Sequence, residues 1–281
     1  MRSAVEALES SGVPRPQWTA EQLLAHHVGC LPLELYVDPV ELAPEPEARF
    51  RAGIAARAGG VPLQYLMGTA GFYGRDFFVG PGVFNPRPET EALVEMALVH
   101  LGSRHGRFTA DGRIPRVVDV GTGSGAIAVT LALERPGLIV VGVERSEVAL
   151  SFARQNGLHH GAGAQFLRGH LLDPVAPASA DLIVANLPYL DPKKSGEWPR
   201  ELHWEPWMAL DGGTEGVDLI RELLSTAGRV MSPGARVILE IGMGQVEAVC
   251  AAAEAQELRV VHVGRDLAGL DRIVVLENAK E

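Results

Sequence analysis

The chain has 281 residues, enough for one large domain or for a large domain and a small one. Its formal net charge of −10 at pH 7 argues against a broad surface for nucleic-acid phosphates, so we expect no stable nucleic-acid partner. The two cysteines, Cys30 and Cys250, suit a reducing cytoplasm, and no group of residues has the spacing of a metal site. We expect neither a signal peptide nor a membrane span, because no segment approaches ~20 apolar residues.

The first 66 residues contain no strand-like run and are predicted to form a small helical domain. Helical patterns cover residues 4–9, 19–27 and 46–58, and prolines separate them. Thr19 is the expected N-cap of the second helix, since it stands just before the apolar positions of that pattern.

Residues 67–86 have a different character, and we predict a β-hairpin linker there. Short aromatic runs lie between glycines in the segments 71–74 and 76–80, as in two short strands joined by a turn. From Arg87 to residue 281, helical patterns alternate with apolar runs, which indicates a second, larger domain.

Seven apolar runs in this larger domain are predicted to be strands, and helical segments are expected to separate the first five. Near-continuous valine, isoleucine and leucine runs indicate strands buried on both faces, as in a parallel sheet. The last two strands are joined by the short segment 264–271 and are expected to be antiparallel neighbours. The fold class is therefore predicted as α/β, with a doubly wound seven-stranded sheet. The expected strands are 117–120, 139–144, 165–168, 182–185, 237–241, 260–263 and 273–276.

A glycine-rich loop follows the first of these strands. It runs from Asp119 through Gly121, Thr122, Gly123 and Ser124 to Gly125, and a helical pattern follows it. Glycines allow a tight turn and close backbone approach, and the free N–H groups of the following helix attract polar or anionic groups. Glu144 ends the next strand, roughly 20 residues after the first glycine, where an acid can bind ribose hydroxyls. The loop therefore predicts a nucleoside cofactor.

The identity of that cofactor stays open on the loop alone. The pattern Gly121-x-Gly123-x-x-Ala126 also satisfies the fingerprint for a nicotinamide or flavin dinucleotide. Asp119 favours S-adenosylmethionine, because the amino group of that molecule needs a nearby acceptor.

The tetrapeptide Asn186-Leu187-Pro188-Tyr189 follows the fourth strand of the larger domain. In a doubly wound sheet whose order reverses beside the first strand, the first and fourth strands are neighbours, so Asn186 should lie beside the glycine loop. The Asn186 oxygen and the residue 187 carbonyl can each accept one N–H of an amide or aromatic amine. Pro188 stiffens the turn, and the Tyr189 ring offers a stacking face. These four residues predict methyl transfer to nitrogen without a strong base.

At this point the chain resembles the release factor glutamine methyltransferases, over essentially its whole length. The matching segments are Val61 to Leu66 with Gly68, Pro86-Arg87-Pro88-Glu89-Thr90-Glu91, the glycine loop, Glu205-Pro206 with Ala209 to Gly213, Leu239 to Gly242, and Asp266 to Arg272. Leu187 replaces the first proline of the usual Asn-Pro-Pro-Tyr, Glu144 stands where an aspartate is common, and His170-Leu171 stand where the family often has an acid and an aromatic residue near the adenine.

The resemblance implies a helical N-terminal domain, a hairpin linker and a seven-stranded S-adenosylmethionine-dependent methyltransferase domain with an antiparallel last strand. It implies methylation of the glutamine side-chain nitrogen in the Gly-Gly-Gln motif of peptide chain release factors. Residues 170 and 171, with Asn186, would add to the cofactor site. We expect a cytoplasmic monomer in which residues 1–66 help to recognise the protein substrate.

Two other functions remain open from the sequence. Adenine N6 in RNA or DNA presents a similar planar amine, and Asn-Leu-Pro-Tyr is also typical of ribosomal RNA adenine dimethyltransferases. A catalytically silent, methyltransferase-like binding factor is the other alternative. The acidic charge argues against the first, and the intact Gly121, Glu144 and Asn186 argue against the second.

Overall fold

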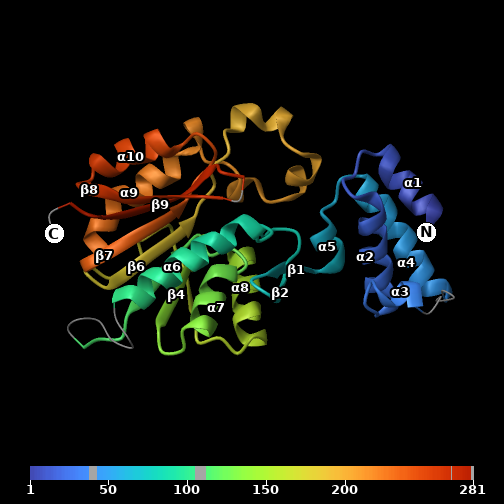
Figure 1. Ribbon diagram of the computed structural model, residues 1–281, viewed down its shortest axis with the longest axis horizontal. Helices are drawn as coiled ribbons and strands as arrows, with labels where there is room; N and C mark the ends of the chain where they lie inside the picture. The colour runs from blue at the N-terminus through green and yellow to red at the C-terminus, as the bar shows by residue number, and fades with distance from the viewer. Residues whose placement is uncertain (38–42, 105–111, 267, 280–281) are drawn as a thin grey trace.

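The computed structural model describes residues 1–37, 43–104, 112–266 and 268–279. Leu267, in one of the segments that carry the family resemblance, lies outside the described residues. Figure 1 shows a small helical part near the N-terminus and a larger α/β part, with a short hairpin between them.

The described residues of the N-terminal part of the chain form five helices. They are α1 (Arg2–Ser10), α2 (Pro16–Val28), α3 (Glu34–Val37), α4 (Pro44–Ala58) and α5 (Leu63–Met67). Their shared core contains Leu8, Leu23 and Phe50, from three different helices. The apolar positions of these helices thus bury one another, as the helical patterns predicted.

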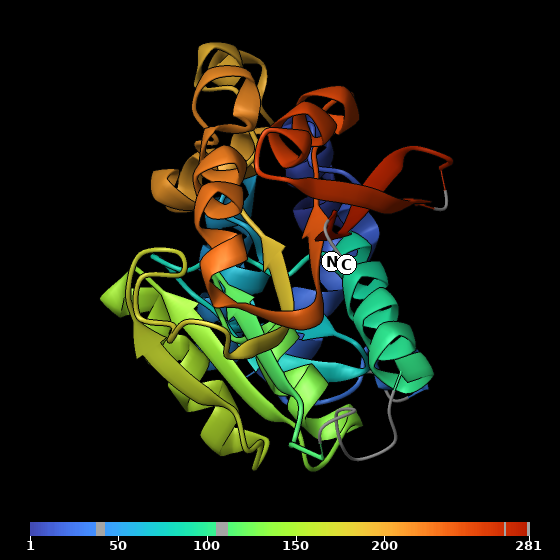
Figure 2. The same ribbon diagram turned by 90° about the vertical axis from the view of Figure 1, so that its left-hand side faces the viewer.

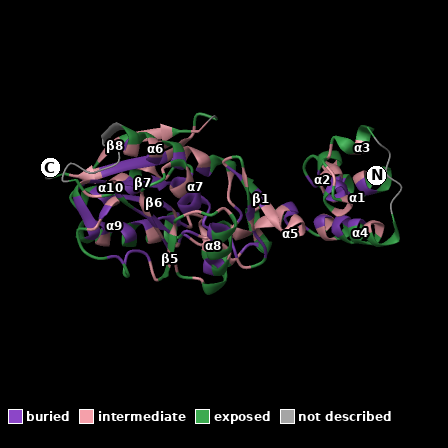
Figure 3. Ribbon diagram, turned by 90° about the horizontal axis from the view of Figure 1, so that it is seen from below, coloured by how far each residue is buried: buried purple, intermediate pink, exposed green. Residues whose placement is uncertain are grey.

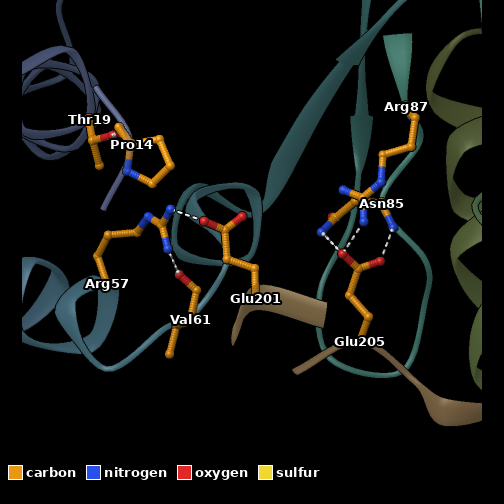
Figure 4. Close-up of polar contacts among 8 residues, drawn as sticks. All are labelled: Pro14, Thr19, Arg57, Val61, Asn85, Arg87, Glu201 and Glu205. Carbon is orange, nitrogen blue, oxygen red and sulfur yellow. Dashed lines mark hydrogen bonds and ion pairs between the residues drawn. The ribbon is translucent and has the colours of Figure 1, made fainter. Parts of the chain in front are cut away.

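The prediction that Thr19 caps α2 was wrong. The helix begins three residues earlier at Pro16, whose fixed φ and missing N–H suit the first turn of a helix. Thr19 is buried inside the helix, and its hydroxyl donates a 3.4 Å hydrogen bond to the carbonyl oxygen of Pro14. Figure 4 shows this pair.

The hairpin consists of β1 (Thr69–Phe72) and β2 (Arg75–Phe78), which pair antiparallel. Tyr73 and Gly74 form the turn with φ of 51° and 72°, which suits the right-handed twist of the two strands. Phe72 and Phe77 are fully buried and join the core of the α/β part. The hairpin is therefore packed against the larger part of the molecule.

The larger part contains a seven-stranded sheet with the order β5-β4-β3-β6-β7-β9-β8. Its strands are β3 (Arg116–Val120), β4 (Ile139–Glu144), β5 (Gln165–Arg168), β6 (Ala180–Asn186), β7 (Met231–Glu240), β8 (Leu258–Arg265) and β9 (Asp271–Asn278). β9 runs antiparallel to both of its neighbours, and β3 to β7 pair in parallel. The predicted strands, their parallel core and the antiparallel last strand are confirmed.

Helices cover both faces of this sheet (Figures 1 and 2). The helices are α6 (Glu91–Arg104), α7 (Ala126–Glu134) and α8 (Glu147–His159) on one face, and α9 (Asp218–Val230) and α10 (Val246–Glu254) on the other. Val117 and Val118 show why the strand runs are continuous: adjacent residues point to opposite faces and enter different cores. Figure 3 shows the buried residues concentrated in the sheet and in the sides of the helices that face it.

One expected helix is missing. Residues 169–179, between β5 and β6, form turns without a helix, although helical segments were expected between the first five strands. Pro174 and Pro177 interrupt this segment, and Leu171 adopts a φ of 45°. The Arg229 side chain holds it in place by donating to the carbonyl oxygens of Leu172 and Val175, at 2.8 and 3.0 Å.

A long loop, residues 190–212, leaves the sheet after β6 and reaches toward the helical part (Figure 1). The loop is closed at its base, where Leu190 N–H donates to Leu210 and Gly212 N–H donates to Leu190, at 3.0 and 2.9 Å. It contains the short 3₁₀ helices η2 (Pro192–Glu197), η3 (Arg200–Trp204) and η4 (Trp207–Ala209), and η5 (Thr214–Gly216) follows it.

Gly216 packs directly under the predicted catalytic turn, which gives a stability prediction. A Cβ at residue 216 would lie 2.1 Å from the Tyr189 carbonyl oxygen, and φ there is +71°. Gly161 has a similar φ of +62° with no atom within 4 Å, so it serves as the matched control. We expect Gly161→Ala to lower the free energy of unfolding by about 1 kcal/mol, and Gly216→Ala by about 2–4 kcal/mol. Equal losses in urea denaturation would contradict this packing.

Candidate functional site

The site lies at the carboxyl ends of β3 and β6. These strands are parallel neighbours, with Val120 opposite Ala185, so the glycine loop and Asn186 leave the sheet side by side. A cavity of about 330 Å³ opens at this point. The predicted site residues that line it are Gly121, Thr122, Gly123, Ser124, Glu144, His170, Leu171, Asn186, Leu187, Pro188 and Tyr189.

Two of the predicted cofactor residues, Asp119 and Gly125, lie behind the cavity wall instead of on it. Asp119 is fully buried, and one carboxylate oxygen accepts hydrogen bonds from the Thr122 hydroxyl and the Ala128 N–H. Burial raises the pKa of Asp119 to about 7, and these two hydrogen bonds oppose the rise. A Cβ at Gly125 would lie 3.1 Å from Cα of Ala153 in α8. Both residues hold the loop in shape, and their direct contact with a cofactor stays a prediction.

Glu144 is locked onto the glycine loop. Its two carboxylate oxygens accept hydrogen bonds from the N–H groups of Gly123 and Ser146, at 3.0 and 2.7 Å. Each oxygen keeps a further lone pair for another donor. The carboxylate is therefore held at the cavity wall as a two-oxygen acceptor, which suits a ribose diol.

His170 and Leu171 form another part of the cavity wall. The Nε2 atom of His170 lies 2.8 Å from a carboxylate oxygen of Glu222 in α9. Leu171 is buried in a left-handed conformation, with a φ of 45°. This part of the wall therefore combines the His170 imidazole, which is held by Glu222, with the apolar side chain of Leu171. The contact of these two residues with adenine remains a prediction.

The side chain of Asn186 is oriented by a hydroxyl. Its Nδ2 donates a 2.9 Å hydrogen bond to Oγ1 of Thr90, in the 3₁₀ helix η1 (Pro88–Thr90). The amide oxygen is consequently the acceptor that remains for a ligand in the cavity. This is the group that the sequence predicted would accept an N–H of the substrate.

The rest of the tetrapeptide is buried or half-buried. The Leu187 side chain packs against the loop, with Cδ2 3.1 Å from the position that a Gly121 Cβ would take. Burial raises the pKa of Tyr189 to about 12, so its hydroxyl stays protonated and cannot serve as a base near neutral pH. The Tyr189 carbonyl accepts a 2.9 Å hydrogen bond from Gln245, which fixes the end of the turn.

Sequence reasoning missed a group of cavity residues around Arg87. The Arg87 guanidinium lies over the Phe84 ring, 4.7 Å from its centroid, and both residues line the cavity. Arg87 also forms an ion pair with the buried Glu205, which accepts a 3.2 Å hydrogen bond from the Asn85 N–H. Figure 4 shows Glu205 between Asn85 and Arg87. Only the resemblance had marked these segments, which lie more than a hundred residues apart in the chain.

The 190–212 loop supplies further cavity residues that sequence reasoning did not assign to the site. Leu202, Pro206 and Met208 line the cavity; the family resemblance marked Pro206, and no pattern in the sequence pointed to Leu202 or Met208. Trp204 and Trp207 are not among the lining residues and are half exposed. Among the described residues, no cluster of metal ligands is found and no helix is long and apolar enough to cross a membrane.

Comparisons with known proteins identify the family. A family model described as the PrmC N-terminal domain matches residues 1–68, and one described as the methyltransferase small domain matches residues 105–198. The chain is 38% identical over 270 residues to the release factor glutamine methyltransferase of Geobacter sulfurreducens, which covers 95% of this chain and 91% of that protein. It is also 38% identical over 282 residues to that of Moorella thermoacetica, with coverage of 99% and 97%. The chain belongs to the release factor glutamine methyltransferase family.

Solved structures agree on the fold of this family member. A T. thermophilus 16S rRNA N2 G1207 methyltransferase, in complex with AdoMet and guanosine, matches with a TM-score of 0.54 and 21% identity. It covers 75% of this chain and 49% of that one. A methyltransferase from Pyrococcus furiosus matches with a TM-score of 0.54 and 16% identity, covering 83% and 98%. The predicted family and the predicted methyltransferase fold are confirmed.

The locked position of Glu144 gives a prediction for the cofactor site. We expect Glu144→Ala to weaken S-adenosylmethionine binding by about 1.5–3 kcal/mol, because charge-assisted hydrogen bonds to the ribose are lost. Glu147→Ala is the matched control, since that carboxylate lies nearby in ion pairs with the exposed Arg154 and Arg168. Calorimetric titration measures the S-adenosylmethionine affinity of both variants. Tight binding of a nicotinamide dinucleotide in place of S-adenosylmethionine would refute the assignment of the cavity.

Proposed function

We propose that the protein transfers a methyl group from S-adenosylmethionine to the side-chain amide nitrogen of the glutamine in the Gly-Gly-Gln motif of peptide chain release factors. The observation that carries this proposal is the shared cavity: the glycine loop and Asn186 meet there, in a chain that belongs to the family of that activity. We further propose that it works as a monomer in the cytoplasm, without a stable nucleic-acid partner.

The cavity wall has the groups that S-adenosylmethionine requires. Glu144 would bind the ribose hydroxyls, His170 and Leu171 would border the adenine, and the loop from Gly121 to Gly125 would follow the rest of the molecule. When bound there, S-adenosylmethionine supplies a methyl group on a positively charged sulfur. Asn186 lies on the same wall and directs the substrate nitrogen toward that group.

The substrate nitrogen is a weak nucleophile, because its lone pair is delocalised into the amide. The Asn186 oxygen would accept one of its N–H groups and the residue 187 carbonyl the other. Positive charge grows on this nitrogen during transfer, so both hydrogen bonds strengthen in the transition state. The methylated nitrogen is then a strong acid and releases its proton to water. A base is not required, in keeping with the high pKa of Tyr189.

A direct test separates this function from methylation of a nucleic acid. Purified release factor and total RNA are incubated together with the protein and S-adenosylmethionine that carries a labelled methyl group. We expect label in the release factor, on the glutamine of Gly-Gly-Gln. Label in RNA alone would favour adenine methylation, and the absence of label in both would favour a silent binding factor.

The role of the tetrapeptide in the chemical step is tested by single-turnover methylation of release factor. Asn186→Ala should lower turnover about 10²–10³-fold, since one preorganised acceptor is lost. Tyr189→Phe keeps the stacking face and should be mild, whereas Tyr189→Ala should be severe. Leu187→Pro keeps the carbonyl and should remain active. Near wild-type turnover in Asn186→Ala would mean that the tetrapeptide is only a structural turn.

We also propose that residues 1–66 recognise the protein substrate, with residues 67–86 as the linker and residues 87–281 as the catalytic domain. Every described residue that lines the cavity lies after residue 81, so the helical part is not needed to form it. The helical part contacts the 190–212 loop, where the buried Arg57 forms an ion pair with Glu201 and donates to the Val61 carbonyl at 3.2 Å (Figure 4). This contact sets where the helical part stands relative to the mouth of the cavity.

The Arg57 contact gives a prediction that separates recognition from chemistry. Arg57→Met keeps much of the volume but removes the ion pair, so we expect KM for intact release factor to rise by about 10-fold, as for a lost charged hydrogen bond. The kcat/KM for a short Gly-Gly-Gln peptide should stay unchanged. Arg49→Met is the matched control, because Arg49 lies on the same helix in an exposed pair with Glu45. Equal losses on both substrates would contradict the proposal.

A further inference from the structure

Two buried residues outside the tetrapeptide, Thr90 and Glu240, lie next to the Asn186 side chain. Glu240 ends β7 and is the register partner of Asn186, which ends β6. Thr90 comes from η1, far away in the sequence. Their exposures are 4% for Thr90 and 2% for Glu240. Neither residue is explained by packing alone, since an apolar side chain would fill the same space without burying a polar group.

The hydrogen bonds among the three residues form a chain with a fixed direction. Asn186 Nδ2 donates to the Thr90 hydroxyl oxygen at 2.9 Å. Thr90 and Asn186 both lie close enough to the Glu240 carboxylate for hydrogen bonding from them to lower its pKa. A hydroxyl has a single proton, so when Thr90 donates it to Glu240, its oxygen is available only as an acceptor toward Asn186.

The Glu240 carboxylate is the group that fixes the donor-to-acceptor direction of this chain. The oxygen and the nitrogen of an asparagine amide have nearly the same shape, so packing alone does not distinguish the two orientations. A threonine by itself could donate to the amide oxygen or accept from the amide nitrogen. An ionised carboxylate only accepts, and it therefore imposes one orientation on the whole chain of groups.

The charge around Glu240 is compatible with this role. Burial raises the pKa of Glu240 to about 7 and the nearby Glu89 adds to the rise, while Thr90, Arg272 and Asn186 oppose it. One Glu240 oxygen, Oε2, is buried without a hydrogen-bond partner among the described residues. The carboxylate is therefore ionised above about pH 7, and one of its two oxygens receives no hydrogen bond from the described residues.

We propose that Thr90 and Glu240 are positioning residues that hold the Asn186 amide with its oxygen toward the substrate nitrogen. The inference rests on the proposed role of Asn186 in methyl transfer. In the reversed orientation, the Asn186 NH₂ group would face the NH₂ group of the glutamine, donor against donor. The site would then lose an acceptor and gain a repulsive contact, although its shape would be unchanged.

The test uses substitutions that change one hydrogen-bonding group at a time. Thr90→Val removes the hydroxyl at constant shape, Thr90→Ser restores it, and Glu240→Gln replaces the acceptor by an amide that can also donate. Thr130→Val is the matched control, because the Thr130 hydroxyl is fully buried with no hydrogen-bond partner among the described residues. Single-turnover rates on release factor are measured well above pH 7, together with S-adenosylmethionine affinity and stability.

We expect Thr90→Val and Glu240→Gln to lower the single-turnover rate by about 10–100-fold, as removal of an orienting partner typically does. Cofactor affinity should change little, Thr90→Ser should recover most of the rate, and Thr130→Val should stay within about 2-fold of wild type. In an Asn186→Ala background, Thr90→Val should cause no further loss, because the group that it orients is gone.

The outcomes separate this inference from the proposed function. If Asn186→Ala is slow while Thr90→Val and Glu240→Gln turn over like wild type, the positioning role is refuted and the role of Asn186 survives. If Thr90→Val lowers cofactor affinity or stability as much as the rate, or if Thr90→Ser fails to rescue it, the two residues are structural. If Asn186→Ala turns over like wild type, the proposed role of Asn186 is refuted, and the positioning role that rests on it is refuted too.

Discussion

The reversal of strand order at β3 is the constraint on which the site depends. β4 and β6 flank β3 on opposite sides, and all three strands run in the same direction. Their carboxyl ends therefore meet at one edge of the sheet, and connections leave that edge on both sides. The glycine loop follows β3, and Glu144 and Asn186 are the last residues of β4 and β6. Backbone pairing thus brings together a site whose segments lie far apart in sequence.

Buried carboxylates then orient the side chains and loops that the sheet brings together. Asp119 holds the back of the glycine loop, Glu205 holds Arg87 over Phe84, and Glu240 lies behind Asn186 and Thr90. Burying a carboxylate is costly unless hydrogen bonds or opposite charges compensate for lost water. Each of these acids has such partners, and none of the three lines the cavity. They are best understood as groups that fix the orientation of the cavity wall.

The fold could be predicted largely from the sequence, since long apolar runs buried on both faces leave few alternatives to a parallel sheet. The glycine loop and the tetrapeptide were found because each is a local pattern that follows a strand. Local patterns failed where neighbours decide the outcome. Thr19 does not cap α2, because the helix already begins at Pro16. The segment before β6 forms no helix, and the Arg229 side chain donates hydrogen bonds to its backbone. Asp119 belongs to the loop motif, but its burial behind the loop could not be read from spacing.

The contacts of Thr90, Glu205 and Glu240 were beyond the reach of sequence reasoning. Each depends on a partner about a hundred residues away or on the neighbouring strand, and no local pattern specifies such a pairing. The family resemblance marked the segments that contain them without saying what they do. In the structure these segments lie close together, around the cavity and around the residues that border Asn186.

The most direct test of this account is a crystal structure of the protein with S-adenosylhomocysteine and a Gly-Gly-Gln peptide. We expect the glutamine nitrogen to lie about 3 Å from both the Asn186 side-chain oxygen and the residue 187 carbonyl oxygen. We also expect Asn186 Nδ2 to donate to the Thr90 hydroxyl oxygen in this complex. A glutamine bound away from Asn186, or an Asn186 amide reversed with its nitrogen toward the substrate, would contradict the account.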